Sequence, residues 1–210
     1  SDLMGNFSFG DYFKSDAIKF AWDFLTQEIG LPVEKLYASV YELDDEAHEI
    51  WKKEIGLAPE KIVKLGKADN FWQMGETGPC GPCSEIYIDR GLEFGCGQIT
   101  CLPGCSCDRF LEIWNLVFMQ FGRQPSGDRP LKSKGVDTGM GLDRLCYVVQ
   151  NKESVFETDI FESIILKIEQ LSNLSYKSAD ISIKSAFRVV ADHIRSSSFA
   201  ICDGVIPSNE

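Results

Sequence analysis

The first half of the chain alternates between helical and strand patterns of apolar residues. Apolar side chains repeat every three to four positions over residues 12–29 and 44–55, which predicts two helices. Gly30 ends the first helix and Asp44 caps the second. Short apolar runs predict strands over residues 36–41, 62–65, 85–89 and 110–121.

Residues 110–121 form the longest predicted strand, and both of its faces are largely apolar. Such a strand is typical of the centre of a sheet that is covered on both sides. Glu112 and Asn115 are its polar exceptions. Because side chains alternate along a strand, an ideal strand would place these two on opposite faces.

The strand patterns end after Gly141. Beyond it, helices are predicted over residues 142–150, 159–172 and 182–200. A mixture of helices and strands followed by helices alone indicates two parts. We predict an α+β domain over residues 1–150 and the beginning of a helical domain over residues 151–210.

Composition limits the class of protein. The chain has 210 residues, 44% hydrophobic and 25% charged, as expected of a water-soluble globular protein. No apolar run approaches the roughly 20 residues that span a bilayer, and no signal peptide is evident. The formal net charge of −11 argues against a general nucleic-acid binder. Any contact with nucleic acid must therefore use a local patch or parts outside these residues.

Six of the eight cysteines lie between Cys80 and Cys107. Cys80-Gly-Pro-Cys83 has the spacing of a thiol–disulfide redox pair, in which a helix N-terminus lowers the pKa of the first thiol. Here residues 84–89 are predicted to form a strand, so this activation is lost. The alternative is a tight turn shaped by the glycines and prolines of the segment.

Four further cysteines lie close together in the sequence: Cys96, Cys101, Cys105 and Cys107. Four thiolates suffice for a tetrahedral zinc site, although these spacings are irregular for the common zinc modules. Free thiols on an inserted loop are the alternative.

Residues 136–145 contain several candidate ligand-binding residues. Gly139 and Gly141 allow a backbone to pass close to a ligand. Arg144 falls in the first turn of the predicted helix, where its guanidinium and the helix N-terminus suit a phosphate. Asp137 suits a ligand ammonium or a metal. The alternative is an ordinary helix N-terminus with a glycine turn and a surface arginine.

Asn115, Trp72 and Asp137 could together line a small pocket. The carboxylate would bind an ammonium, the amide a carboxylate or carbonyl, and the indole would form a wall against a small side chain. His48 and His193 lie in predicted helices far apart in the sequence, so no histidine general base is predicted.

Four long segments of the chain resemble a known family in their sequence. They are residues 5–14, residues 70–85, residues 111–121 together with 136–144, and residues 191–210. They include Asn70-Phe-Trp-Gln-Met-Gly75 and Val136-Asp-Thr-Gly-Met-Gly-Leu-Asp-Arg144. In this order they resemble the alanyl-tRNA synthetases, a family of class II aminoacyl-tRNA synthetases. The resemblance implies a class II antiparallel sheet flanked by helices, followed by an all-helical segment that begins a tRNA-recognition region.

The resemblance also implies roles for single residues. Arg144 and Gly141 would bind ATP, and Arg144 would hold its phosphates. Glu112 would act beside Arg144, near ATP and magnesium. The strand would need a bulge or a strong twist to bring Glu112 and Asn115 to the same site. The amino-acid pocket would be formed by Trp72, Asn115, Asp137, which binds the alanine ammonium, and Gly139, which forms the floor.

The implied reaction joins alanine and ATP to form alanyl-adenylate and then transfers alanine to the 3′ end of its tRNA. Positioning of the substrates and neutralisation of phosphate charge supply most of the catalysis of such a reaction, so it needs no histidine base. The resemblance also implies a cytoplasmic location. Asn209 falls where the family recognises the G·U pair of the acceptor stem. Lys184, Arg188 and Arg195 could contact tRNA phosphates, and a solvated helix face is the alternative.

Parts of the family pattern lie outside these residues. Motif 1, the first part of motif 2 and the editing domain would be elsewhere, so we expect a fragment with little or no aminoacylation activity alone. Some members bind zinc through histidines after the Cys-Gly-Pro-Cys turn. Those positions hold no histidine here, and the four later cysteines could substitute. Two alternatives remain open: a non-catalytic synthetase-like tRNA-binding module and a thiol–disulfide oxidoreductase.

Overall fold

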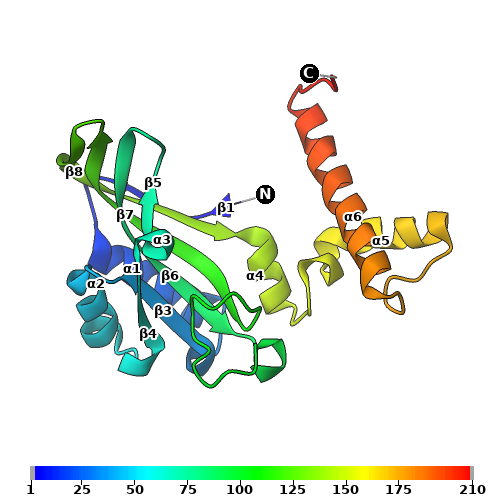
Figure 1. Cartoon of the computed structure of the whole chain (residues 1–210), viewed down its shortest axis with the longest axis horizontal. Helices are drawn as coiled ribbons and strands as arrows, with labels where there is room; N and C mark the ends of the chain where they lie inside the picture. The colour runs from blue at the N-terminus through cyan, green and yellow to red at the C-terminus, as the bar shows by residue number, and fades with distance from the viewer. Residues whose placement is uncertain (1–2, 209–210) are drawn as a thin grey trace. The chain divides into compact units, whose positions relative to one another are not determined.

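The computed structural model of the chain describes residues 3–208 and divides them into two compact units (Figure 1). One unit spans Leu3–Gly141, and the other begins at Leu142. The division therefore comes at the start of a helix, somewhat before the boundary at residue 150 that the sequence suggested. The assignment of the two parts to a catalytic core and a tRNA-recognition region stays a prediction.

An eight-stranded sheet forms the centre of the first unit, in the order β1-β8-β7-β6-β3-β4, with β2 paired to β8 and β5 paired to β6. All of these pairs are antiparallel except β3 with β4, which is parallel. The strands are β1 (Leu3–Met4), β2 (Phe7–Phe9), β3 (Leu36–Tyr41), β4 (Ile62–Leu65), β5 (Phe71–Gln73), β6 (Gly78–Asp89), β7 (Phe110–Gln124) and β8 (Gly127–Gly141). The predicted α+β fold with a helix-flanked sheet is confirmed.

The short strands β1, β2 and β5 were not predicted from the sequence, and two long strands differ from the prediction. The segment predicted over 85–89 is only the end of β6, which already begins at Gly78. No strand was predicted over the first residues of β8, which are polar and exposed. Pairing with β7 holds these residues in the sheet, so their backbone is satisfied without burial of their side chains.

Two helices precede the central strands. The helix α1 (Lys14–Asp23) continues into the π-helical η1 (Phe24–Glu28), and α2 (Asp45–Glu49) continues into η3 (Ile50–Ile55). Both predicted helices are therefore confirmed. The carboxylate of Asp44 caps α2, since its Oδ1 accepts a hydrogen bond from the Ala47 N–H at 3.1 Å.

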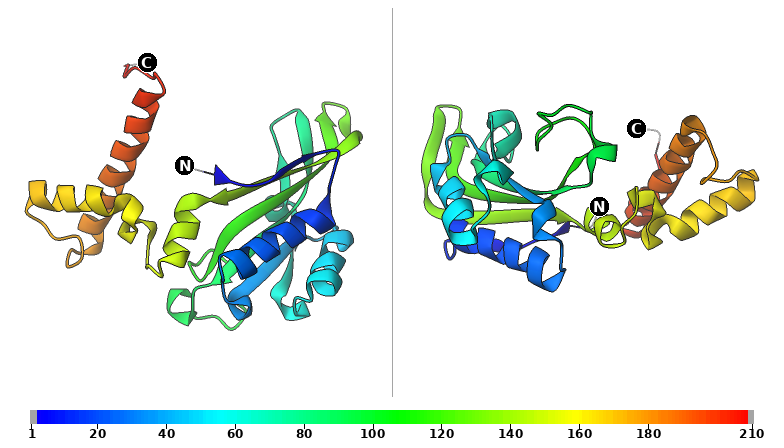
Figure 2. Two further views of the ribbon diagram at one scale, coloured as in Figure 1. Left: turned by 180° about the vertical axis from the view of Figure 1, so that it is seen from behind. Right: turned by 90° about the horizontal axis from the view of Figure 1, so that it is seen from below.

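The helix α1 covers one face of the sheet, and the segment of residues 90–109 lies on the opposite face (Figure 2). Aromatic rings join α1 and its neighbours to β7, with edge-on contacts of Phe13 to Phe118 and of Phe24 to Trp114. The side chains of Trp114 and Phe118 therefore point toward α1. Because side chains alternate, Asn115 and Val117 point to the other face.

Short elements connect these parts: η2 (Val33–Lys35), η4 (Pro59–Lys61), α3 (Lys67–Asn70) and η5 (Leu92–Phe94). The second unit contains α4 (Leu142–Val149), η6 (Val155–Glu157), α5 (Asp159–Ser172) and α6 (Ile181–Cys202), which confirms the three predicted helices. Its small core consists of Phe161, Ile165, Tyr176, Phe187 and Ala191. Within residues 3–208, no helix is long and apolar enough to cross a membrane.

Candidate functional site

Four residues proposed for a pocket surround a single cavity of about 310 Å³ on the face of the sheet opposite α1. Its lining comes from three strands of the sheet and the N-terminal segment: Trp72 of β5, Asn115 and Val117 of β7, Asp137, Thr138 and Gly139 of β8, with Leu3, Met4 and Phe7. The pairing of β7 with β8 places Asn115 beside Gly139 and Val117 beside Asp137. Residues far apart in the sequence thus become direct neighbours.

Charge and space in this cavity suit a small cationic group. The carboxylate of Asp137 is half-buried and forms no ion pair with any other of residues 3–208. Gly139 leaves room, because a Cβ at that position would meet no atom within 4 Å. Trp72 is half-buried at the edge of the cavity. The arrangement combines an available carboxylate, an open floor and an indole wall.

The amide of Asn115 is oriented by a buried carboxylate. Its Nδ2 donates a hydrogen bond to Oε1 of Glu85 at 3.1 Å, and its Oδ1 is buried without a hydrogen-bond partner in the described part of the chain. A buried acceptor that no protein donor satisfies is available to a hydrogen-bond donor of a ligand. The amide of Asn115 therefore offers an oxygen acceptor beside Asp137. This acceptor suits a ligand ammonium better than the ligand carboxylate or carbonyl that was expected from the residue type.

Glu85 lies at the centre of this buried network, and the sequence analysis did not single it out. Its carboxylate accepts hydrogen bonds from the Tyr87 hydroxyl and, at 3.4 Å, from the Ser39 hydroxyl. Burial, with a smaller contribution from the nearby charge of Glu112, raises the pKa of Glu85 to about 7, although the hydrogen bond from Tyr87 opposes the shift. The available signal was a carboxylate at the first residue of the strand predicted over residues 85–89.

A bulge in β7 brings Glu112 and Asn115 to the same face of the sheet. Glu85 of β6 pairs with Asn115 of β7, and Tyr87 pairs with Glu112. One residue lies between the two positions on β6, whereas two residues lie between them on β7. Because Glu85 and Tyr87 share a face, their partners share it too. The opposite-face placement expected of an ideal strand is therefore wrong here, and the bulge that Glu112 required is present.

Replacing Glu85 with Gln should change how stability depends on pH. Because the pKa of Glu85 is higher in the folded than in the unfolded chain, the folded state favours the protonated carboxyl. The contribution of this group to folding stability is therefore complete below its unfolded-state pKa and is lost as the pH rises through about 7. Between about pH 4.5 and 8, we expect the native chain to lose on the order of 3 kcal/mol of unfolding free energy through this group. Urea unfolding across that range should show a much smaller loss in the Glu85→Gln variant.

The matched control is Glu76→Gln, because Glu76 is exposed. It should keep the pH dependence of the unsubstituted chain. Equal pH slopes for the native chain and Glu85→Gln would contradict the raised pKa of Glu85.

The Cys80–Cys83 segment lies within β6, so the expected tight turn is wrong. The pairing with β7 shifts register between Cys80 and Cys83, which accommodates Gly81 and Pro82 as an irregular stretch of strand rather than a turn. Both thiols are buried. Burial, followed by the charge of Glu85, raises the pKa of Cys83 to about 12. Since the thiolate is the reactive form, this environment opposes the redox alternative.

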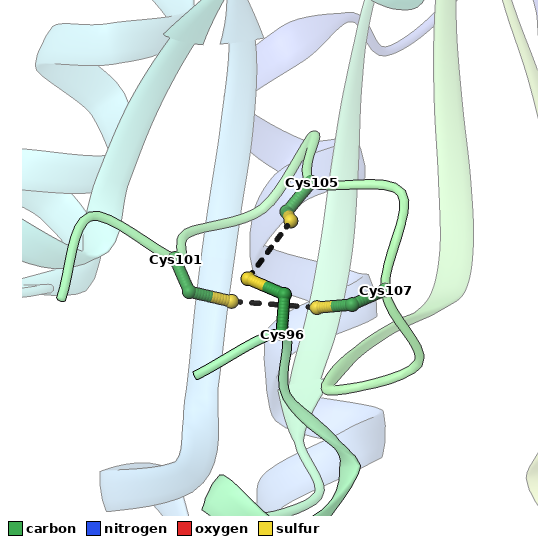
Figure 3. Close-up of side chains that lie close together, drawn as sticks. All are labelled: Cys96, Cys101, Cys105 and Cys107. Atoms are coloured by element: carbon green, nitrogen blue, oxygen red, sulfur yellow. Dashed lines mark hydrogen bonds between the residues drawn. The ribbon is translucent and has the colours of Figure 1, made fainter. Parts of the chain in front are cut away.

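The four remaining cysteines of this region do come together in space. The Sγ atoms of Cys96, Cys101, Cys105 and Cys107 all lie within 4.8 Å of one another and point toward a common centre (Figure 3). They form a cluster that could hold a metal ion.

The predicted phosphate and tRNA residues belong to the end of β8 and to the second unit. Gly141 is the last residue of β8, and Arg144 is an exposed residue in the first turn of α4. The guanidinium of Arg188 donates to the Tyr176 hydroxyl at 2.8 Å, and that of Arg195 lies 5.5 Å from the ring of Phe161. Both are half-buried within their own unit. They do not lie on a fully solvated helix face.

Lys184 is also half-buried, with its ammonium 5.9 Å from the ring of Tyr176. Asn209, the predicted contact to the acceptor stem, lies outside the described residues.

Comparison with known proteins supplies an independent observation. The family model described as tRNA synthetases class II (A) matches residues 2–210. Curated relatives named alanine–tRNA ligase are 56% identical in Desulfosudis oleivorans, 52% in Oleidesulfovibrio alaskensis and 55% in Nitratidesulfovibrio vulgaris. Each match covers 100% of this chain and 24% of the relative, so the chain spans about a quarter of their length.

Proposed function

Because the chain belongs to the class II (A) tRNA synthetases, we propose that it forms part of the catalytic region of an alanine–tRNA ligase. The full-length protein would activate alanine with ATP and then transfer alanine to the 3′ end of its tRNA, in the cytoplasm. The names of the relatives support alanine as the amino acid. The observation that carries the proposal is the convergence of Trp72, Asn115, Asp137 and Gly139 on one cavity.

In this proposal the cavity binds alanine. The carboxylate of Asp137 pairs with the alanine ammonium, and Oδ1 of Asn115 accepts one of its hydrogens. Trp72 and Val117 enclose the methyl side chain, and Gly139 leaves space for the amino-acid backbone. Such a pocket discriminates weakly among small amino acids, because one methylene is worth only about 1–3 kcal/mol.

The chemical step requires the alanine carboxylate and the α-phosphate of ATP to be held in line. A carboxylate oxygen bonds to the α-phosphorus, and the bond to pyrophosphate breaks. We assign Arg144, at the first turn of α4 and shortly after Gly141, to the ATP phosphates. Magnesium, when bound, would neutralise phosphate charge, and Glu112 would hold it.

We also assign tRNA contacts to Arg188, Arg195 and Asn209. The hydrogen bond to Tyr176 and the ring of Phe161 restrict the two guanidinium groups, which would lower the entropy lost on binding a phosphate. These assignments suit a chain of net charge −11, because binding would then use a few placed arginines rather than an overall basic surface.

Pyrophosphate exchange tests the proposed activity. The full-length protein that contains this chain should exchange labelled pyrophosphate into ATP when alanine is present, and much less with glycine or serine. The 210-residue chain alone should show little or no exchange, because it spans only about a quarter of the length of the alanine–tRNA ligases that it resembles. No alanine-dependent exchange in the full-length protein would refute the proposal.

A non-catalytic tRNA-binding module is the alternative that the same experiment separates. Such a protein would bind tRNA but would show neither exchange nor stabilisation by a non-hydrolysable alanyl-adenylate analogue. Turnover by the isolated chain near that of the full-length protein would contradict the expectation that the fragment is inactive.

A further inference from the structure

The cluster of Cys96, Cys101, Cys105 and Cys107, named here the four-thiol cluster, has the geometry of a closed metal site. The Sγ atoms of Cys96 and Cys105 are 3.8 Å apart, and those of Cys101 and Cys107 are 3.4 Å apart. A tetrahedral zinc ion with Zn–S bonds of about 2.3 Å requires S···S separations of about 3.8 Å. Separations of 3.4 Å to 4.8 Å surround that value.

These distances are inconsistent with disulfides, which bring two sulfurs to about 2.05 Å. All four cysteines are free. Figure 3 shows Cys96 facing Cys105 and Cys101 facing Cys107, with the four sulfurs gathered in one place. Because all four Sγ atoms lie within 4.8 Å of one another, the two pairs form one group that can surround a single ion.

The surrounding loop has little else to hold it together. Between β6 and β7 only η5 is regular, and Leu92, Ile99 and Leu102 are exposed. The base of the loop is closed by Arg109, whose Nε and Nη2 donate to the carboxylate of Asp89 at 2.9 and 2.6 Å. A loop that buries so few apolar side chains usually needs a metal or a disulfide to become ordered.

We propose that Cys96, Cys101, Cys105 and Cys107 bind one Zn²⁺ as a structural tetrathiolate site. Each thiol releases its proton to solvent when its sulfur coordinates the ion, and four sulfurs leave no open position for catalysis. The proposed zinc site does not include Cys80 or Cys83, which are residues of the strand β6.

The four-thiol cluster is connected by packing to the candidate alanine cavity. Cys101 packs against Tyr87 and Phe110 in a small buried cluster. The Tyr87 hydroxyl donates to Glu85, which in turn accepts from Asn115. Zinc would therefore hold in place a loop that covers Tyr87, a positioning residue for the Glu85–Asn115 pair. Only this link rests on the proposed function, because the metal site itself needs neither alanine nor ATP.

Metal analysis of the purified chain tests the site directly. We expect about one zinc per chain, falling by more than tenfold in the double variant Cys101→Ser/Cys107→Ser. Cys202→Ser is the matched control, because Cys202 is an exposed cysteine outside the cluster, and it should retain the metal. No bound metal in the unsubstituted chain, iron in place of zinc, or equal loss in the control would overturn the proposal.

Two measurements on the unsubstituted chain avoid variants that fail to fold. Removing the metal with a chelator should expose four additional thiols to a thiol reagent, and adding Co²⁺ should produce the absorption of a tetrathiolate complex. Hydrogen–deuterium exchange should then become faster in residues 90–109 and at Tyr87. Unchanged thiol reactivity would overturn the site, and unchanged exchange would overturn its structural role.

Discussion

Replacing Asp137 with Asn is expected to lower alanine-dependent pyrophosphate exchange by about 10²- to 10³-fold in the full-length protein, as kcat/KM. Asn keeps the shape of the side chain but removes the charge opposite the alanine ammonium. Breaking a desolvated charge pair costs about 2–5 kcal/mol, and each 1.4 kcal/mol is about tenfold in rate or affinity. The ammonium is present before and during the reaction, so KM should rise more than kcat falls.

The matched control for this prediction is Asp128→Asn. Asp128 is an exposed residue of the same strand, and it pairs with Arg123 at 2.8 Å at the far end of the β7–β8 hairpin. Exposed pairs contribute little, so exchange should change by less than about twofold. If the two variants had similar activity, Asp137 would not be the ammonium site.

Replacing Gly81 with Ala is expected to destabilise the chain by on the order of 3 kcal/mol, or to prevent folding. A Cβ at Gly81 would lie 1.9 Å from the backbone oxygen of Phe118, and backbone cannot turn aside as a flexible side chain can. The irregular stretch of β6 would have to move away from β7. Urea unfolding or thermal denaturation of the chain measures the loss.

The same substitution should also disturb the cavity, because Gly81 pairs with Trp72 of β5. Gly75→Ala is the control, since a Cβ at Gly75 would meet nothing within 4 Å and the residue is exposed. We expect its stability to stay within about 0.5 kcal/mol of the unsubstituted chain. A Gly81→Ala chain as stable as the control would show that the close approach of β6 and β7 is unimportant.

Much of the secondary structure follows from local patterns. The apolar repeat over residues 12–29 and the cap at Asp44 predicted helices that the structure confirms, because helix periodicity and capping depend on neighbours within one or two turns. The central position of β7 also followed from its two apolar faces. The first residues of β8 were missed because they are polar on both faces and are held by pairing alone.

The candidate site could be found in part. Trp72, Asn115, Asp137 and Gly139 were selected by resemblance and by residue type, and the structure places all four around one cavity. Glu85 was not selected, although it orients Asn115, because its role depends on a hydrogen bond between two strands that are far apart in the sequence. A local pattern identifies a polar residue in a strand but not the partner that satisfies it.

The sequence by itself determined most of the helices and several of the strands, the order of the two parts and the residue types available for binding. Only the tertiary structure decided that Cys80–Cys83 lies in a strand, that a bulge unites Glu112 with Asn115, and that four thiols meet. The physical reason is that strand register and loop closure are set by pairing between distant segments. A shift of one residue in that pairing reverses the face of every following side chain, whereas the sequence pattern stays the same.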